Sequence, residues 1–168
     1  VLEGPLDELY AQITDRNPDT RFEAILGRNA LGALADKEQI IATLHQHLAP
    51  QGRISLVETL SRKSQRLYQL VDLDSVDPDL SQRLVAAEEA LYSDTEHPQV
   101  NWDTADFEAI FSIAGFSRVQ TRIEEIRTQR HIDSRQLNHW FSRGGEKRHT
   151  YAHYLAQHLD EGELDQVR

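Results

Sequence analysis

Residues 21–59 read RFEAILGRNALGALADKEQIIATLHQHLAPQGRISLVET, and the hydrophobic pattern within them changes period twice. The first part, 21–27, is short, mostly apolar and ends in glycine, which is typical of a strand buried on both faces. Asp36 then begins a predicted helix, and Gln39 three residues later makes a capping-box-like arrangement. The apolar side chains of this helix recur at helical spacing and form one stripe: Ile40, Ile41, Leu44 and Leu48.

A second strand is predicted after this helix. Pro50-Gln51-Gly52 predicts a turn, and Ile54-Ser55-Leu56-Val57-Glu58 follows with the pattern of a strand. A strand, a helix and a strand joined by short connections nearly always form a right-handed parallel crossover. We therefore expect an α/β fold with a small, mainly parallel sheet and flanking helices.

Helices and one further strand are predicted for the next part of the chain. We expect helix over 61–92, broken at 72–79, where Pro78 lies. Asp103 is predicted to cap another helix, which Gly115 terminates. A third strand is predicted at 119–123, where apolar and polar residues alternate, and the alternation changes phase before Ile126, which predicts a bulge or a strand end.

The tail of the chain is predicted to be helical. Ser134 is expected to cap a helix, Gly144-Gly145 to break the chain, and 151–159 to carry a last apolar stripe. We therefore predict a partial α/β domain at 1–132 and, packed on it, a helical extension at 133–168.

The composition narrows the class of protein. The chain has 168 residues, a formal net charge of −10, 39% hydrophobic and 27% charged residues, as in soluble globular proteins. No apolar run approaches the roughly 18 residues of a spanning helix, and no secretory signal is visible, so we expect no membrane partner and a cytoplasmic location. With no cysteine, disulfides, thiolate metal sites and cysteine nucleophiles are excluded.

The sequence also has features of a fragment. It contains no methionine, even at position 1, and its first residues resemble the end of a strand. A sheet of three strands would leave a long edge open, which is a liability for aggregation. We expect the remainder of a longer polypeptide, or a second copy of the chain, to cover that edge.

The pattern resembles class I S-adenosylmethionine-dependent methyltransferases. Residues 21–59 are similar to the fourth strand, the following helix and the fifth strand of that family, and Leu48-Ala49-Pro50-Gln51-Gly52-Arg53-Ile54 matches its approach to the fifth strand. FEAIFSIAGFSRVQTRIEE, at 107–125, is similar to the family's helix, Ala-Gly-Phe turn and sixth strand. The resemblance covers about 1–132 and implies a partial Rossmann-like methyltransferase fold. These motifs are structural, so they imply activity only weakly.

A second set of motifs resembles the domain fused to the replication-associated recombination AAA ATPase of cyanobacteria. These are EGPLDELYAQI, GRNALGALADK, VNWDTADF and Trp140-Phe141. The resemblance implies an accessory or interaction domain, methyltransferase-like but not catalytic in this fragment, in a larger ATPase of DNA replication and recombination. The alternative is the C-terminal half of an active methyltransferase. The chain has no Gly-x-x-x-x-Gly-Lys-Ser/Thr, so ATP hydrolysis does not reside here.

The chain departs from the methyltransferase pattern where the cofactor would bind. It has no Gly-x-Gly, the loop that lets the backbone approach the cofactor, and it lacks the acidic residue that the family uses on the ribose. We therefore expect S-adenosylmethionine binding only of an intact domain and none of this fragment.

Three residues are candidates for binding a cofactor. Ligands of open α/β sheets lie beyond the carboxyl ends of parallel strands, which points to Arg28 and Asn29 after the first strand and to Glu58-Thr59 after the second. Arg28 could hold an anion, and Asn29 could orient a polar group; the alternative is that both satisfy backbone groups of their loop. Glu3, near the adenine edge by resemblance, could be an ordinary charged residue at a strand end.

Metal and nucleic-acid binding receive less support. His149 and His153 lie one helical turn apart and His158 follows, but no His-Glu-x-x-His is present, so we predict no metal site. A basic concentration surrounds Trp140, but the acidic chain opposes attraction to phosphates, so we do not expect nucleic-acid binding by this segment alone. The adjacent acids Glu88 and Glu89 are interpreted as part of a solvated face.

Overall fold

The computed structural model describes residues 11–13, 15, 19–129, 131–142 and 150–168. Two compact units are formed by these residues. The sheet unit comprises Val1–Arg62 and Thr95–Ile123, and the helical unit comprises Lys63–Asp94 and Glu124–Arg168. The predicted boundary between 132 and 133 stays a prediction. Glu3, Gly144-Gly145 and His149 lie outside the described residues.

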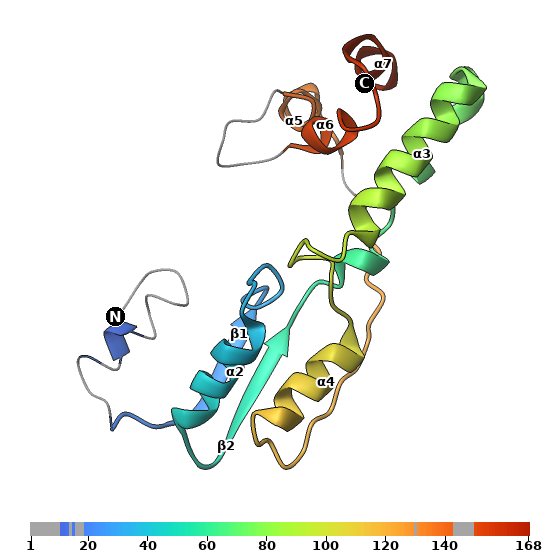
Figure 1. The fold of residues 1–168 in the computed structure, drawn as a ribbon. Coiled ribbons are helices and arrows are strands. Elements are labelled where there is room, and N and C mark those ends of the chain that lie inside the picture. Colours follow the sequence, from blue (N-terminus) through green and yellow to red (C-terminus); the bar gives the residue numbers. More distant parts are fainter. Residues whose placement is uncertain (1–10, 14, 16–18, 130, 143–149) are drawn as a thin grey trace. The chain divides into compact units, whose positions relative to one another are not determined.

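The sheet unit contains a parallel pair of strands, as predicted. Strand β1 (Phe22–Arg28) pairs with β2 (Leu48–Val57), and helix α2 (Lys37–Gln46) connects them (Figure 1). In the part of the chain that is described, the sheet has these two strands. The α/β character and the small parallel sheet are thus confirmed, and the methyltransferase-like fold remains a proposal.

The strands differ from the prediction in two details. β1 is not buried on both faces: its residues are half-buried or exposed, and Leu26 is 78% exposed, because α2 and α4 both pack on the opposite face. β2 begins at Leu48, six residues before the predicted start, because Pro50-Gln51-Gly52 is a register shift within the strand and not a separate turn. Gln51 adopts φ 64°, and a Cβ on Gly52 would lie 2.8 Å from the Ala49 carbonyl oxygen.

Helix α4 (Thr104–Ile113) completes the covered face of the sheet. Asp103 caps it by accepting from the N–H groups of Ala105 and Asp106, and Gly115 follows it at φ +98°; both predictions are confirmed. α2 and α4 contact each other (Figure 1). Leu56 of β2 packs against the core that these helices share. The fully or almost fully buried side chains of this core are Leu31, Ile41, Trp102 and Phe107.

Asp36 does begin α2, but not with the predicted capping box. It is the N-cap residue, yet its side chain makes no capping hydrogen bond. Its φ of −94° and ψ of 53° lie outside the extended backbone conformation that normally brings an N-cap side chain over the first turn.

The third predicted strand is wrong. Residues 119–123 form no strand, and Ile123 is 53% exposed. The segment runs beside α4 (Figure 1), and the Thr121 hydroxyl donates to the Glu108 carboxylate of that helix. Alternation of side chains defines the two faces of a strand, but a strand also needs a neighbouring strand for its backbone hydrogen bonds. Among the described residues, no strand pairs with 119–123.

The helical unit is built around α3 (Pro78–Ser93), which Asp77 caps. Three short 3-10 turns precede it: η1 (Ser61–Lys63), η2 (Leu67–Leu70) and η3 (Leu73–Ser75). The helix predicted over 61–92 is therefore correct only beyond Pro78. The core of this unit consists of Leu80, Leu84, Ala87, Leu155 and Leu159.

The described residues of the tail form three short helices: α5 (Ser134–Trp140), α6 (Tyr151–Leu155) and α7 (Glu161–Val167). The helical character of this part is confirmed. The cap of α5 is Asp133 and not Ser134, because the Asp133 carboxylate accepts from the Gln136 N–H at 2.7 Å. The predicted last stripe spans a break, since α6 ends at Leu155 and His158 lies beyond it.

Candidate functional site

The carboxyl ends of β1 and β2 meet at a loop that the Glu58 carboxylate organises. Its Oε1 accepts from the N–H groups of Ala30 at 2.8 Å and Leu31 at 3.2 Å, and its Oε2 accepts from the Gly32 N–H at 3.0 Å. Successive N–H groups aimed at one point are a typical anion site in such folds. Here the anion is the chain's own side chain.

Asn29 and Arg28 occupy the same edge of the sheet but differ in their contacts. Asn29 adopts φ 48°, and its Oδ1 accepts from both the N–H and the hydroxyl of Thr59 at 3.0 Å. These contacts join the loop after β1 to the loop after β2. They agree with the alternative interpretation, in which Asn29 satisfies backbone groups of its loop. Arg28 is exposed and pairs with Val57 through its backbone, and within the described ranges its side chain makes no hydrogen bond or ion pair. The cofactor-binding roles of Glu3, Arg28 and Asn29 stay predictions.

Lys37 is a buried cation at the start of α2. Its side chain is almost wholly buried, and Nζ donates to the carbonyl oxygens of Leu34 at 2.6 Å and Pro98 at 2.7 Å. Burial removes water from the ammonium group and lowers the pKa of Lys37, while the negative charge of Glu58 acts in the opposite direction. Lys37 therefore joins the loop after β1 to the segment before α4.

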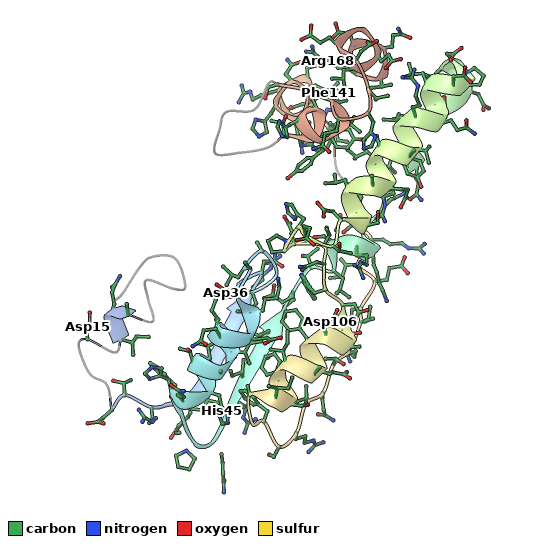
Figure 2. All side chains as sticks on the ribbon, in the orientation of Figure 1. Asp15, Asp36, His45, Asp106, Phe141 and Arg168 are labelled. Atoms are coloured by element: carbon green, nitrogen blue, oxygen red, sulfur yellow. The ribbon has the colours of Figure 1, made fainter. Side chains whose placement is uncertain are left out.

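A hollow of about 430 Å³ opens beside Lys37. Asp36 at the start of α2 and Asp106 in the first turn of α4 lie at this hollow (Figure 2). Its lining residues are Ala35, Asp36, Lys37, Glu38, Gln39, Asn101, Trp102, Asp106 and Ile110. Three carboxylates line this hollow, and its one lysine already donates to two carbonyl oxygens, so the hollow is poorly suited to the phosphates of a nucleotide.

The helical unit holds a second buried charge, which the sequence interpretation missed. Glu88 is fully buried and does not belong to a solvated face. Its Oε1 accepts from the Leu67 N–H at 2.6 Å, and its Oε2 accepts from the Tyr68 N–H at 3.0 Å and the Tyr151 hydroxyl at 2.9 Å. The sequence did contain a signal for this burial, because position 88 lies one helical turn beyond Leu84 on the apolar stripe of α3.

The next residue on α3, Glu89, lies at the surface of the unit. Its side chain is 45% exposed, and it pairs with the Arg66 guanidinium at 3.1 Å and accepts from the Tyr68 hydroxyl at 2.8 Å. The Tyr68 and Arg66 hydrogen bonds lower the pKa of Glu89. Glu89 therefore resembles the solvated acid that the sequence predicted, and Glu88 does not.

Tyr151 makes the alkaline stability of the helical unit depend on pH. Burial, then the Glu88 charge and hydrogen bond, raise the pKa of Tyr151 far above its usual value. The unfolded phenol ionises near pH 10 and the folded one does not, so this stabilisation is present below about pH 10 and lost as pH rises further. We expect urea midpoints of the Tyr151→Phe variant to fall less between pH 9 and 11 than those of the wild type. An equal fall in both proteins would contradict this account.

A smaller hollow of about 300 Å³ lies within the helical unit, next to α6 and α7. Phe141 and Arg168 mark it in Figure 2. It is lined by Phe141, Ser142, Ala152, His153, Ala156, Glu161, Leu164, Asp165 and Arg168. Apolar side chains and charges of both signs share this lining, so it does not indicate one class of ligand.

The sequence also raised the possibility of a metal site and of a nucleic-acid site. Within the described ranges, no three histidines or acids lie close enough to hold a metal ion. Near Trp140, where the basic residues concentrate, Tyr151 packs edge-on against Phe141 and Arg127 pairs with Glu125, so these two side chains have partners within the chain. No helix in the described part of the chain combines the length and hydrophobicity needed to cross a bilayer.

Comparisons with protein-family models, curated proteins and solved structures find no match to this chain.

Proposed function

We propose that this chain is an accessory or interaction domain, methyltransferase-like in fold but not catalytic, within a larger AAA ATPase of DNA replication and recombination. The context of an ATPase comes from the resemblance of the motifs at 3–13, 27–37 and 100–107. The absence of catalysis is supported by the geometry at the ends of the strands. A role in interaction is supported by the sheet face that α2 and α4 leave exposed, where Leu26 is 78% and Val57 is 64% exposed.

The observation that carries the proposal is the position of the Glu58 carboxylate. In open α/β sheets the loop beyond the strand ends presents N–H groups to the ligand. In this chain, the N–H groups of Ala30, Leu31 and Gly32 donate to Glu58 instead. A cofactor at this edge would have to displace a carboxylate that makes three hydrogen bonds, at a cost of about 1.5–3 kcal/mol for each bond to a charged group.

The second support is the charge near this edge. The hollow beside Lys37 is lined by Asp36, Glu38 and Asp106, and the chain as a whole carries −10. A surface of this charge repels phosphates, so direct binding of nucleic acid is not the role we assign to this segment. Its partners are the remainder of the polypeptide and, as a second arrangement, another copy of the chain.

Calorimetric titration with S-adenosylhomocysteine tests the proposal. We expect the full-length protein that contains this chain to give no saturable heat at micromolar ligand, while an active class I methyltransferase titrated alongside does. Micromolar binding that Asn29→Ala weakens would overturn the proposal and favour the alternative, the C-terminal half of an active methyltransferase. The reading frame upstream of the Val1 codon tests the ATPase context, because a Gly-x-x-x-x-Gly-Lys-Ser/Thr motif there supports it and a strand followed by Gly-x-Gly opposes it.

A further inference from the structure

One face of the β1–β2 sheet carries apolar side chains and arginines that α2 and α4 leave exposed. Side chains alternate along both strands, so that Ile25, Ile54 and Leu56 are half-buried and the residues between them are exposed. Leu56 belongs to the core that α2 and α4 share, whereas Leu26 is 78% and Val57 is 64% exposed. The exposed sheet face consists of Ala24, Leu26, Arg28, Arg53, Ser55 and Val57.

The two arginines lie at opposite corners of the exposed sheet face. The register places Arg53 beside Ala24 and Arg28 beside Val57, with Leu26 in the row between them. At about 3.3 Å per residue and about 4.8 Å between strands, the Cα atoms of Arg28 and Arg53 are about 14 Å apart. The apolar side chains of this face are therefore flanked by a cation at each end.

Neither arginine has a carboxylate partner among the described residues. Within the described ranges, the side chains of Arg28 and Arg53 make no hydrogen bond or ion pair. Arg66 of the helical unit, by contrast, pairs with Glu89. The exposed sheet face therefore offers two guanidinium groups to a partner, and each can hold a carboxylate through two hydrogen bonds.

The composition of this face differs from that of a permanently buried one. Parallel strands that are covered on both faces are rich in Val, Ile and Leu. On this face, Arg28 and Arg53 accompany the apolar Leu26 and Val57. Arginine mixed with apolar residues is typical of interfaces between separate proteins, since obligate interfaces are more apolar. The face thus favours a separate partner over a fixed layer of the same fold.

Charge and apolar area together distinguish the classes of partner. A second copy that applied the same face would bring two arginines and no carboxylate. A phosphate backbone would meet two cations but would leave Leu26 and Val57 without an apolar contact, and the net charge of −10 opposes it. That charge also acts on an acidic protein, but it is screened beyond about 8 Å at physiological salt. A surface with two carboxylates around an apolar centre matches both features of the face.

A helix can present such a surface, and helices are the elements that normally cover a parallel sheet. Residues i and i+7 of a helix lie on one side about 10.5 Å apart, and i+3 and i+4 lie between them. Glutamates at i and i+7 are thus spaced within about 4 Å of the distance between the two arginines, and long side chains can close this difference. The line that joins the arginines is inclined by about 20° to the strands, so the helix would run almost along them.

We infer that the exposed sheet face binds an acidic amphipathic helix of a separate protein. Carboxylates at i and i+7 of that helix pair with Arg28 and Arg53, and apolar side chains at i+3 and i+4 pack on Leu26 and Val57. The inference rests on the interaction role proposed above and adds the chemistry of one partner. Titration with S-adenosylhomocysteine tests the absence of catalysis, whereas the binding measured below tests this face alone, so either can fail without the other.

Fluorescence anisotropy with a labelled peptide tests this on the full-length protein that contains this chain. The peptide is a helix of alanine and glutamine, about 18 residues long, with Glu at i and i+7 and Leu at i+3 and i+4. The control peptide has Lys in place of both glutamates. At about 0.15 M salt, we expect the acidic peptide to bind at least about tenfold more tightly than the control peptide.

Paired variants locate the binding on the exposed sheet face. Arg28→Glu with Arg53→Glu is expected to weaken binding of the acidic peptide at least about tenfold, and to strengthen binding of the control peptide. Leu26→Ser is expected to weaken binding of the acidic peptide about tenfold, because it removes the apolar contact. Ile113→Ser is the matched control, since Ile113 at the end of α4 is 77% exposed, and it should leave the affinity unchanged.

Several outcomes would overturn the inference. One is no binding of the acidic peptide or equal affinity for both peptides, and another is an equal loss in Leu26→Ser and Ile113→Ser. Tighter binding of a single-stranded oligonucleotide that Arg28→Glu with Arg53→Glu abolishes would assign the face to phosphates instead. Self-association that Leu26→Ser abolishes would assign it to a second copy.

Discussion

Glu88→Ala is expected to reduce the free energy of unfolding of the helical unit by about 3–5 kcal/mol. The substitution leaves two half-buried N–H groups, of Leu67 and Tyr68, and the Tyr151 hydroxyl without their acceptor. Glu88 is fully buried, so these donors lose their acceptor inside the core of the unit. Urea unfolding followed by far-ultraviolet circular dichroism measures the change, since this unit is mostly helical.

Glu89→Ala is the matched control for Glu88→Ala. It makes the same change one residue later on α3, where the side chain is 45% exposed, and we expect a loss of about 1 kcal/mol or less. If Glu88→Ala does not fold, Glu88→Gln keeps one acceptor oxygen and should lose about 2 kcal/mol. Equal losses for the substitutions at 88 and 89 would show that Glu88 does not hold η2 and α6 to α3.

The second large effect is expected at Glu58. Glu58→Ala removes the acceptor of three N–H groups in the loop after β1, and we expect the sheet unit to lose about 2–4 kcal/mol. The same loop supplies Leu31 to the core and the Gly32 carbonyl oxygen, which accepts from the Trp102 indole at 3.1 Å. The loss should therefore be visible in the fluorescence of Trp102.

This measurement is made on variants that also carry Trp140→Phe. The chain has two tryptophans, so the tryptophan fluorescence then comes from Trp102 alone. Glu38→Ala is the control, since it removes an exposed carboxylate from the first turn of α2 in the same unit. Glu38→Ala should change the urea midpoint little, and Glu58→Gln should lie between the two alanine variants. A wild-type midpoint for Glu58→Ala would contradict the role given to Glu58.

The elements that were predicted correctly are those whose signals are local. The period of the apolar residues and the Asp103 and Gly115 caps determine α4, and the order strand, helix, strand determines the parallel pair. The prediction of a third strand failed because 119–123 has the alternation of a strand but no strand beside it to pair with its backbone. Pairing depends on what lies beside a segment in space, and local pattern carries no information about that.

The candidate site shows the same division. Sequence order placed Arg28, Asn29 and Glu58 at the carboxyl edge of the strands, since parallel strands end on the same side of a sheet. It could not show that Glu58 turns toward the N–H groups of Ala30, Leu31 and Gly32, because those groups lie 26–28 residues away in the chain.

By itself the sequence determined that this chain is acidic, lacks cysteine, and alternates strands with helices, because composition and hydrophobic period depend only on the order of residues. The tertiary structure alone decided which charges are buried. Glu88 and Glu89 are the same residue type in adjacent positions, and successive residues of a helix point about 100° apart, so one enters the core and the other meets solvent. A buried carboxylate needs donors from distant segments, and only the folded chain brings Leu67, Tyr68 and Tyr151 to Glu88.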